Sequence, residues 1–151
     1  MKASVERFIE AIALAGIEVP PEKIVVRDLG CPHNPTPLPK GKMAVYVFSF
    51  ERRVLKIGKV GPNSSARFQT QHYLPGSSNS NLAKSLLADR SGPCWKMNEK
   101  KIGPWMREHL DRTDILLDSD LPIAVLGFLE VFLHCRYSPR YEGFKSQRVS
   151  E

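Results

Sequence analysis

Two short segments rich in valine, isoleucine and aromatic residues limit the folds open to this chain more than any other feature. They cover residues 44–50 and 54–58, and only the charged residues Glu51, Arg52 and Arg53 separate them. Such residue types favour extended backbone, and so short a polar connection lets two strands fold back on each other. The sequence therefore predicts an antiparallel β-hairpin over these residues.

Helical periodicity and chain-breaking residues place the other elements around this hairpin. Four prolines between Cys31 and Gly41 forbid a helix there and indicate a linker or a wrapping arm. The expected helices cover residues 4–15, 66–73, 81–87, 103–110 and 122–137, and the expected further strands cover residues 24–26 and 113–117. We expect an N-terminal helix, short strand and Pro-rich arm over residues 1–41, a folded domain over 42–143, and a basic C-terminal tail over 144–151.

Composition excludes several classes of protein. The 151 residues are enough for one domain of ordinary size. The longest apolar stretch, residues 121–133, is too short to cross a bilayer, so no membrane partner is expected. The first residues lack the apolar run of a secretory signal, which predicts a cytoplasmic protein. Cys31, Cys94 and Cys135 are few and widely spaced, which predicts reduced thiols rather than a disulfide framework.

A series of residues in the core follows the order of a known nuclease motif set. Tyr46 lies in the first strand of the hairpin, Lys56-Ile57-Gly58 in the second, Arg67 on the next helix, and Glu130 on a late apolar helix. Together with Pro139-Arg140-Tyr141, they resemble the GIY-YIG nuclease superfamily over residues 43–143. The resemblance implies a small α+β domain in which helices flank a three-stranded antiparallel sheet. The N-terminal helix is expected as an extension that the resemblance does not cover.

The same resemblance implies a metal-dependent DNA endonuclease, with Tyr46, Lys56, Arg67, His72 and Glu130 as catalytic residues. Hydrolysis of a phosphodiester needs an activated water and cations that neutralise the phosphoryl oxygens, and these residue types supply both. Tyr46 would activate or position water, and Lys56, where the family usually has tyrosine, would favour deprotonation of that hydroxyl. Arg67 would clamp a phosphate. The alternatives are a strand tyrosine packing in the sheet, an exposed strand lysine and a solvated helix arginine.

Two positions depart from the family pattern. The family's helix histidine falls at Gln71 here, and His72 follows one residue later, so His72 reaches the site only if the helix ends there. Glu142 stands where asparagine is common. The other histidines, His33, His109 and His134, fall at no motif position and are expected on the surface.

Glu130 is the only charged residue between Leu121 and Leu133. A carboxylate among apolar residues must be paired, exposed on a narrow strip or bound to a cation. The resemblance makes it the single protein ligand of Mg²⁺ or another divalent cation such as Mn²⁺, with the remaining positions held by water.

Charge and rival functions complete the sequence-based expectations. Lys and Arg outnumber Asp and Glu by 22 to 16, a net charge of +6 that favours a polyanionic partner but also serves solubility. We expect DNA, duplex or branched, as that partner, with contacts from Lys59, Arg136 and Arg140. One rival is a catalytically weakened nucleic-acid-binding module. Another is a protein-interaction domain anchored by the N-terminal helix and by Trp95 or Trp105.

Overall fold

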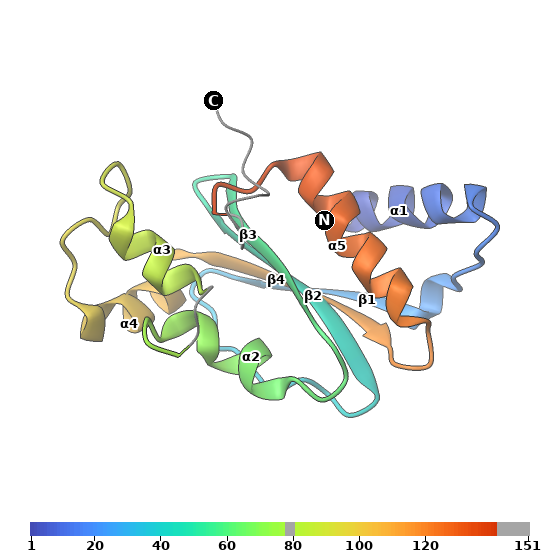
Figure 1. Ribbon diagram of the computed structural model, residues 1–151, viewed down its shortest axis with the longest axis horizontal. Helices are drawn as coiled ribbons and strands as arrows, with labels where there is room; N and C mark the ends of the chain where they lie inside the picture. Colours follow the sequence, from blue (N-terminus) through green and yellow to red (C-terminus); the bar gives the residue numbers. More distant parts are fainter. Residues whose placement is uncertain (78–80, 142–151) are drawn as a thin grey trace.

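The computed structural model describes residues 1–77 and 81–141, in which helices cover both faces of one antiparallel sheet (Figure 1). The strands are β1 (Ile24–Gly30), β2 (Lys42–Phe50), β3 (Arg53–Val60) and β4 (Asp111–Asp118). The helices are α1 (Lys2–Leu14), α2 (Ser65–Gln69), α3 (Leu82–Ala88), α4 (Glu99–His109) and α5 (Ile123–Tyr137), with short 3₁₀ turns η1 (Pro21–Lys23) and η2 (Gln71–Tyr73). The basic tail expected over residues 144–151 lies outside the described residues.

The α+β class predicted from the sequence is confirmed, but the sheet is larger than expected. Within the described residues it has four strands in the order β1-β4-β2-β3, not three, and every neighbouring pair is antiparallel. The added strand is β1, which was expected only as a short strand of the N-terminal segment. It pairs with β4 from Ile24↔Leu117 to Gly30↔Arg112 and so satisfies backbone groups that β4 would otherwise leave open.

The predicted hairpin is confirmed as β2 and β3. Phe50 pairs with Arg53, which leaves Glu51 and Arg52 as the two loop residues. Their φ values are 49° and 68°, both in the left-handed region. A two-residue loop with positive φ at both positions has the twist that strands need to pair closely.

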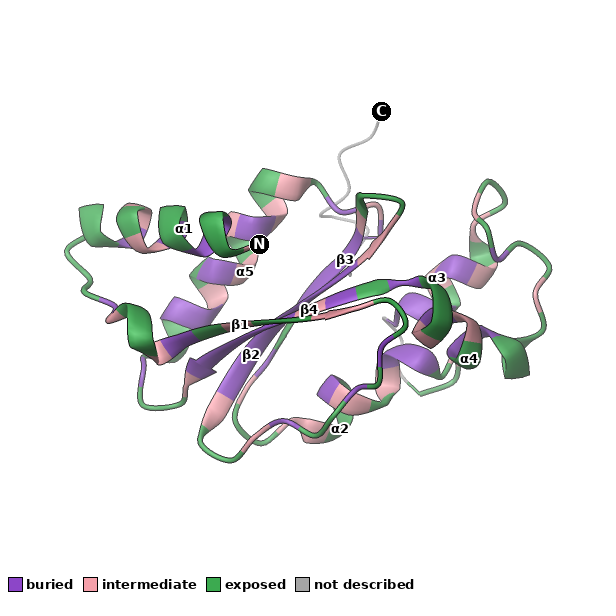
Figure 2. Ribbon diagram, turned by 180° about the vertical axis from the view of Figure 1, so that it is seen from behind, coloured by how far each residue is buried: buried purple, intermediate pink, exposed green. Residues whose placement is uncertain are grey.

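The sheet has a core on each side, and β2 contributes to both (Figure 2). Alternate residues of a strand point to opposite faces. Ala44, Tyr46 and Phe48 face α2, α3 and α4, a set of contacts we name the α2–α4 core. Met43, Val45 and Val47 face α1 and α5, which form the α1/α5 core. Burial on both faces explains why β2 is apolar almost throughout.

The N-terminal helix is part of the α1/α5 core rather than an extension from the domain. Phe8 is fully buried, and its ring centroid lies 5.5 Å from that of Phe128 and 5.8 Å from that of Phe132, both on α5. Figure 1 shows α1 and α5 together on one side of the sheet, with α2, α3 and α4 on the other. The apolar face of α1 is therefore used within the molecule.

The structure confirms the predicted apolar helix near the C-terminus and corrects the start of the helix before β4. The apolar helix over residues 122–137 is confirmed as α5, and no helix in residues 1–77 and 81–141 is long and apolar enough to cross a membrane. The helix expected to begin at Gly103-Pro104 begins earlier, at Glu99, with Pro104 inside it. The side chain of Asn98 accepts a hydrogen bond from Lys100 N at 2.8 Å, and this cap determines the start.

Gly58 lies directly beneath the side chain of Tyr46, its partner across the β2–β3 pair. A Cβ built on Gly58 would lie against the Tyr46 hydroxyl, 2.6 Å from Cζ and 2.8 Å from Cε2 of the ring. These separations are shorter than any normal carbon contact. Glycine is therefore required here so that the tyrosine ring can cross the strand.

We expect Gly58→Ala to reduce the free energy of unfolding by about 1–3 kcal/mol, because the added methyl group must displace the Tyr46 ring. Gly127→Ala is the matched control, since a Cβ there meets only the Lys59 Nζ, at 3.9 Å, and alanine favours a helix. Chemical denaturation should show a loss for the first variant and no loss for the second. Equal stability of both variants would contradict the crossing of Tyr46 over Gly58.

Candidate functional site

Strand register brings the predicted hairpin residues to one face of the sheet. Tyr46 on β2 pairs with Gly58 on β3 and with Asp114 on β4, and the next residue pair on this face is Phe48 and Lys56. Tyr46 and Asp114 are buried, and Lys56 is only 3% exposed. Polar groups thus line the sheet under the α2–α4 core.

His72 reaches this face because α2 is short. The helix ends at Gln69, Thr70 adopts φ −125°, and Gln71–Tyr73 form the separate turn η2. His72 Nε2 lies 2.5 Å from the hydroxyl oxygen of Tyr46, and the two rings are 4.6 Å apart between centroids. The sequence predicted that His72 reaches the site only if the helix ends before it, and the helix does end before it. Gln71 lies beside His72 in η2.

The environment of His72 keeps its imidazole neutral. Burial, and then the positive charges of Lys56, Arg67 and Arg112, lower its pKa to about 3. Its other ring nitrogen, Nδ1, is buried and has no hydrogen-bond partner among the described residues. The neutral imidazole is able to accept a hydrogen bond from the Tyr46 hydroxyl, but with so low a pKa it is a weak base, and the hydroxyl keeps its proton in the free protein.

Arg67 links this buried pair to the surface. Its side chain is exposed, and it forms a side-chain hydrogen bond with Tyr46. Burial raises the pKa of Tyr46, whereas the charge and hydrogen bond of Arg67 act in the opposite direction. Of these side chains, Arg67 is therefore the one that a ligand from solvent meets first.

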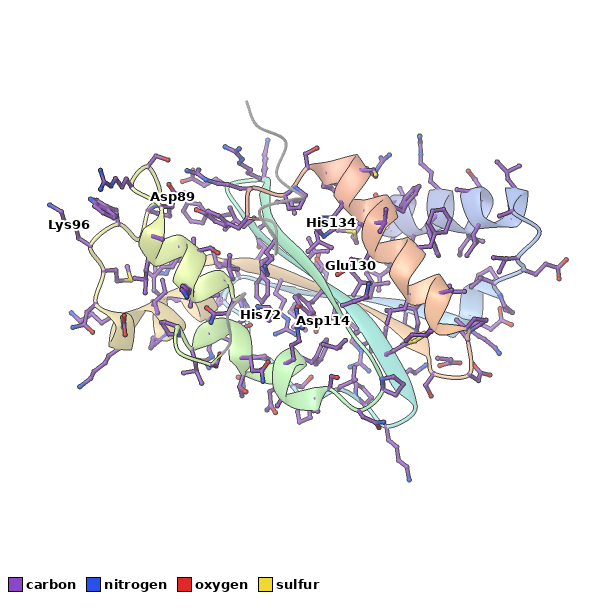
Figure 3. The ribbon with its side chains drawn as sticks, in the orientation of Figure 1. His72, Asp89, Lys96, Asp114, Glu130 and His134 are labelled. Atoms are coloured by element: carbon purple, nitrogen blue, oxygen red, sulfur yellow. The ribbon has the colours of Figure 1, made fainter. Side chains whose placement is uncertain are left out.

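Glu130 comes from α5, on the side of the sheet opposite to α2, α3 and α4, and it reaches strand β3 from that side. Its Oε2 accepts a hydrogen bond from Lys59 Nζ at 2.6 Å, and its side chain is 21% exposed. The Glu130 charge is close enough to raise the pKa of Tyr46. Figure 3 shows His72, Asp114 and Glu130 toward the centre of the molecule, with Asp89 and Lys96 near the loop after α3. The sequence left three possibilities for this carboxylate: an ion pair, exposure on a narrow strip, or a bound cation. In the structure it forms an ion pair with Lys59.

The residues expected to contact DNA all have partners within the chain. Lys59 pairs with Glu130, as described above. Arg136 donates from Nε to Ser4 Oγ at 3.0 Å, which ties α5 to α1. Arg140 pairs with Asp89 at 2.5 Å, and the Tyr141 backbone N–H donates to the Leu55 carbonyl at 2.8 Å. Glu142 lies outside the described residues.

Sequence reasoning missed a buried polar network beside Tyr46. Arg112 is fully buried and donates from Nε to Asp114 Oδ1 at 2.8 Å and from Nη1 to the Tyr73 hydroxyl at 3.0 Å. These residues were overlooked because the strand was expected to begin at Thr113, which left Arg112 outside it. Two charged residues two positions apart, and so on one face of a strand, were the available signal.

His33 is buried, which corrects the expected surface position. Its Nδ1 lies 2.7 Å from the Leu110 carbonyl oxygen, and its Nε2 lies 2.7 Å from the Tyr73 hydroxyl. Both ring nitrogens are thus used in hydrogen bonds.

No group of three metal-ligating side chains occurs in the described part of the chain.

The tryptophans suggested as anchors differ in exposure. Trp105 is half-buried, packing against Phe50 and stacking on His109. Trp95 is 41% exposed, with the guanidinium of Arg90 over its ring.

Comparison with family models, curated proteins and solved structures finds no match to this chain. The resemblance to GIY-YIG nucleases therefore stays a prediction from the order of the motif residues.

The lowered pKa of His72 predicts a specific loss of stability in acid. Between pH 6.5 and about 3, the unfolded chain binds a proton at His72 that the folded chain does not, so acidification favours unfolding. The effect approaches about 1.4 kcal/mol per pH unit. We expect the free energy of unfolding of His72→Gln to fall less steeply than that of the parent from pH 6.5 to 4. Parallel curves from urea unfolding would contradict the neutral, buried imidazole.

Proposed function

We propose that this chain is an endonuclease that hydrolyses DNA phosphodiester bonds with the help of a divalent cation. One observation carries the proposal: the Tyr46 hydroxyl lies over Gly58 and bonds both His72 and Arg67, within range of the Glu130 charge. These residues come from β2, β3, η2, α2 and α5. The proposal is supported by the grouping of His72 and Arg67 at one hydroxyl, on which the Glu130 charge acts from the α5 side of the sheet.

Tyr46 and His72 supply the path for the proton. The attacking water must lose a proton as its oxygen bonds to phosphorus, while the bond from phosphorus to the leaving oxygen breaks and that oxygen takes a proton from solvent. The Tyr46 hydroxyl is buried, so water would reach it only when its exposed partner Arg67 moves to a phosphate. The hydroxyl would then accept the proton of the attacking water as its own moves to the neutral His72 imidazole, 2.5 Å away. The relay leaves the charge on His72 rather than on Tyr46; burial and the nearby cations disfavour that charge in the free protein, and a phosphate bound at Arg67 would offset them.

Lys56 and Arg67 supply positive charge for the phosphate. Arg67 is exposed and presents a planar guanidinium, which binds two phosphate oxygens at once. Lys56 is buried and acts on the same imidazole as Arg67, so its charge acts through protein rather than water. Charge that develops on the phosphoryl oxygens is thus met by groups that are already in place.

Glu130 suits Mg²⁺ or Mn²⁺ as a single carboxylate ligand. Mg²⁺ keeps several of its waters and is often held by only one or two carboxylates, so a lone, partly exposed glutamate is an adequate donor set. Glu130 would hold the cation, which would supply charge neutralisation at the phosphate when bound. Lys59 competes for the same carboxylate, and its long exposed side chain is able to move away.

The two rival functions have less support. A binding module with lost activity has no need of a tyrosine–histidine pair kept neutral and out of water. An interaction domain anchored by the N-terminal helix conflicts with the burial of that helix's apolar face against α5. DNA, duplex or branched, remains the partner best suited to the exposed Arg67 and the net positive charge.

We expect Tyr46→Phe and Glu130→Gln each to lower Mg²⁺-dependent nicking of plasmid DNA by roughly 10²-fold or more. The first variant loses the hydroxyl that carries the proton, and the second loses the charge that holds the cation. Glu130→Gln should change stability by no more than about 1 kcal/mol, because its ion pair is partly exposed.

Each of these variants has a matched control. Tyr137→Phe also removes a hydrogen-bonded hydroxyl, 2.6 Å from Ser4 Oγ, but in contact with α1. Glu108→Gln removes an exposed carboxylate on α4. Both controls should nick at the parent rate. The nuclease proposal is wrong if folded Tyr46→Phe cuts plasmid and branched DNA as fast as the parent.

Removing the competing lysine should tighten metal binding. Lys59→Met keeps the aliphatic stem but frees Glu130, so the Mn²⁺ concentration at half-saturation should fall several-fold by calorimetry. Lys100→Met, on the exposed face of α4, should leave that concentration unchanged. Weaker metal binding by Lys59→Met than by the parent would show that Glu130 is not the ligand.

A further inference from the structure

Arg112 is a fully buried cation with every nitrogen of its guanidinium engaged. Nε donates to Asp114 Oδ1 at 2.8 Å, Nη1 donates to the Tyr73 hydroxyl at 3.0 Å, and Nη2 donates to the Phe68 carbonyl at 2.8 Å. The guanidinium also lies over the rings of Phe68, at 4.7 Å, and Phe48, at 5.4 Å. With no exposed surface, it has no direct contact with a ligand from solvent.

The partners of Arg112 lie on either side of the functional residues in the sequence. Phe68 directly follows Arg67, near the end of α2, and Tyr73 directly follows His72 in η2. Asp114 is the cross-strand neighbour of Tyr46. The Arg112 guanidinium therefore bonds the chain both before His72, at Phe68, and after it, at Tyr73. Its ion pair with Asp114 fixes it beside Tyr46.

A second contact fixes the Tyr73 hydroxyl. His33 Nε2 lies 2.7 Å from this hydroxyl, and His33 Nδ1 lies 2.7 Å from the Leu110 carbonyl oxygen. The Pro-rich arm that carries His33 thus supports η2 through the same hydroxyl that Arg112 contacts. The position of η2 is set by polar contacts with defined directions, in addition to packing.

We propose that Arg112 is a positioning residue that holds η2 and the end of α2 so that His72 and Arg67 meet the Tyr46 hydroxyl. The proposal rests on the proposed endonuclease function for its effect on catalysis. Lysine in place of Arg112 keeps the positive charge but cannot direct three donors to three acceptors. A small displacement of His72 or Arg67 is enough to slow a reaction substantially.

The test uses Arg112→Lys, with Tyr73→Phe as a milder second variant and Ile115→Ala as the control. Ile115 is the buried β4 residue next to Asp114, and it faces the α1/α5 core. Single-turnover nicking by the two test variants should fall between roughly 10-fold and 100-fold. DNA affinity without metal should stay within roughly two-fold of the parent, since both residues are buried. Ile115→Ala should lose thermal stability but nick at the parent rate.

A readout that needs no cleavage follows the ring nitrogens of His72 by NMR. The groups that act on this imidazole are Tyr46, Lys56, Arg67 and Arg112, and Arg112→Lys leaves the number of charges unchanged. In the parent, His72 should stay neutral to about pH 4 because burial lowers its pKa to about 3. Arg112→Lys and Tyr73→Phe should raise that midpoint by roughly one unit or more, as water gains access to the ring. Ile115→Ala should leave it in place.

The outcomes separate the two proposals. If the parent cuts no DNA, the endonuclease function fails, and the His72 signals still decide whether Arg112 positions η2. Should the folded test variants keep the parent nicking rate and His72 midpoint, Arg112 has no positioning role. An equal loss of nicking in Ile115→Ala would also overturn the proposal, because the effect would then follow from lost stability alone.

Discussion

A charged guanidinium without access to water constrains this fold more than any apolar contact. Burying Arg112 is costly unless a carboxylate pairs with it and acceptors meet its remaining donors. Asp114 is available because residues two apart on a strand share a face. The other acceptors come from the end of α2 and from η2. Since removal of one partner of a buried ion pair typically costs about 3–5 kcal/mol, the same contacts stabilise the domain and arrange the candidate site.

The division of the sheet into two faces separates packing from chemistry. The α1/α5 core consists of apolar side chains, whereas Tyr46, Lys56, Arg112 and Asp114 lie on the face of the α2–α4 core. β3 is the last strand of the sheet order, and the Tyr46 hydroxyl lies above it because Gly58 has no side chain. A hydroxyl from the buried strand β2 is thereby placed over an outer strand. There it comes within range of Glu130, which α5 carries to Lys59 of the same strand.

The sequence predicted those parts of the structure that depend on local patterns. The hairpin, α1 and α5 follow from periodicity and turn residues, whereas the roles given to Tyr46, Arg67 and Glu130 stay predictions from the order of the motif. The role of β1 depended on an open edge of β4, which is far away in the sequence. The burial of His33 depended on acceptors from Leu110 and Tyr73, 77 and 40 residues away. Long-range pairing of polar groups leaves little periodic signal, so Arg112 and its network emerged only from the three-dimensional structure.

Under the proposed function, the charges around His72 make its basicity depend on the substrate. Without DNA, burial together with Lys56, Arg67 and Arg112 disfavours the imidazolium form. A phosphate bound at Arg67 brings negative charge that offsets these cations, and this raises the pKa of His72. The imidazole then becomes a stronger base at the moment when a scissile phosphate is present. A buried histidine that is a poor base in the free protein is for this reason consistent with catalysis in the complex. Arg67, one of the cations that depress its pKa, is also the exposed group that would bind the substrate phosphate.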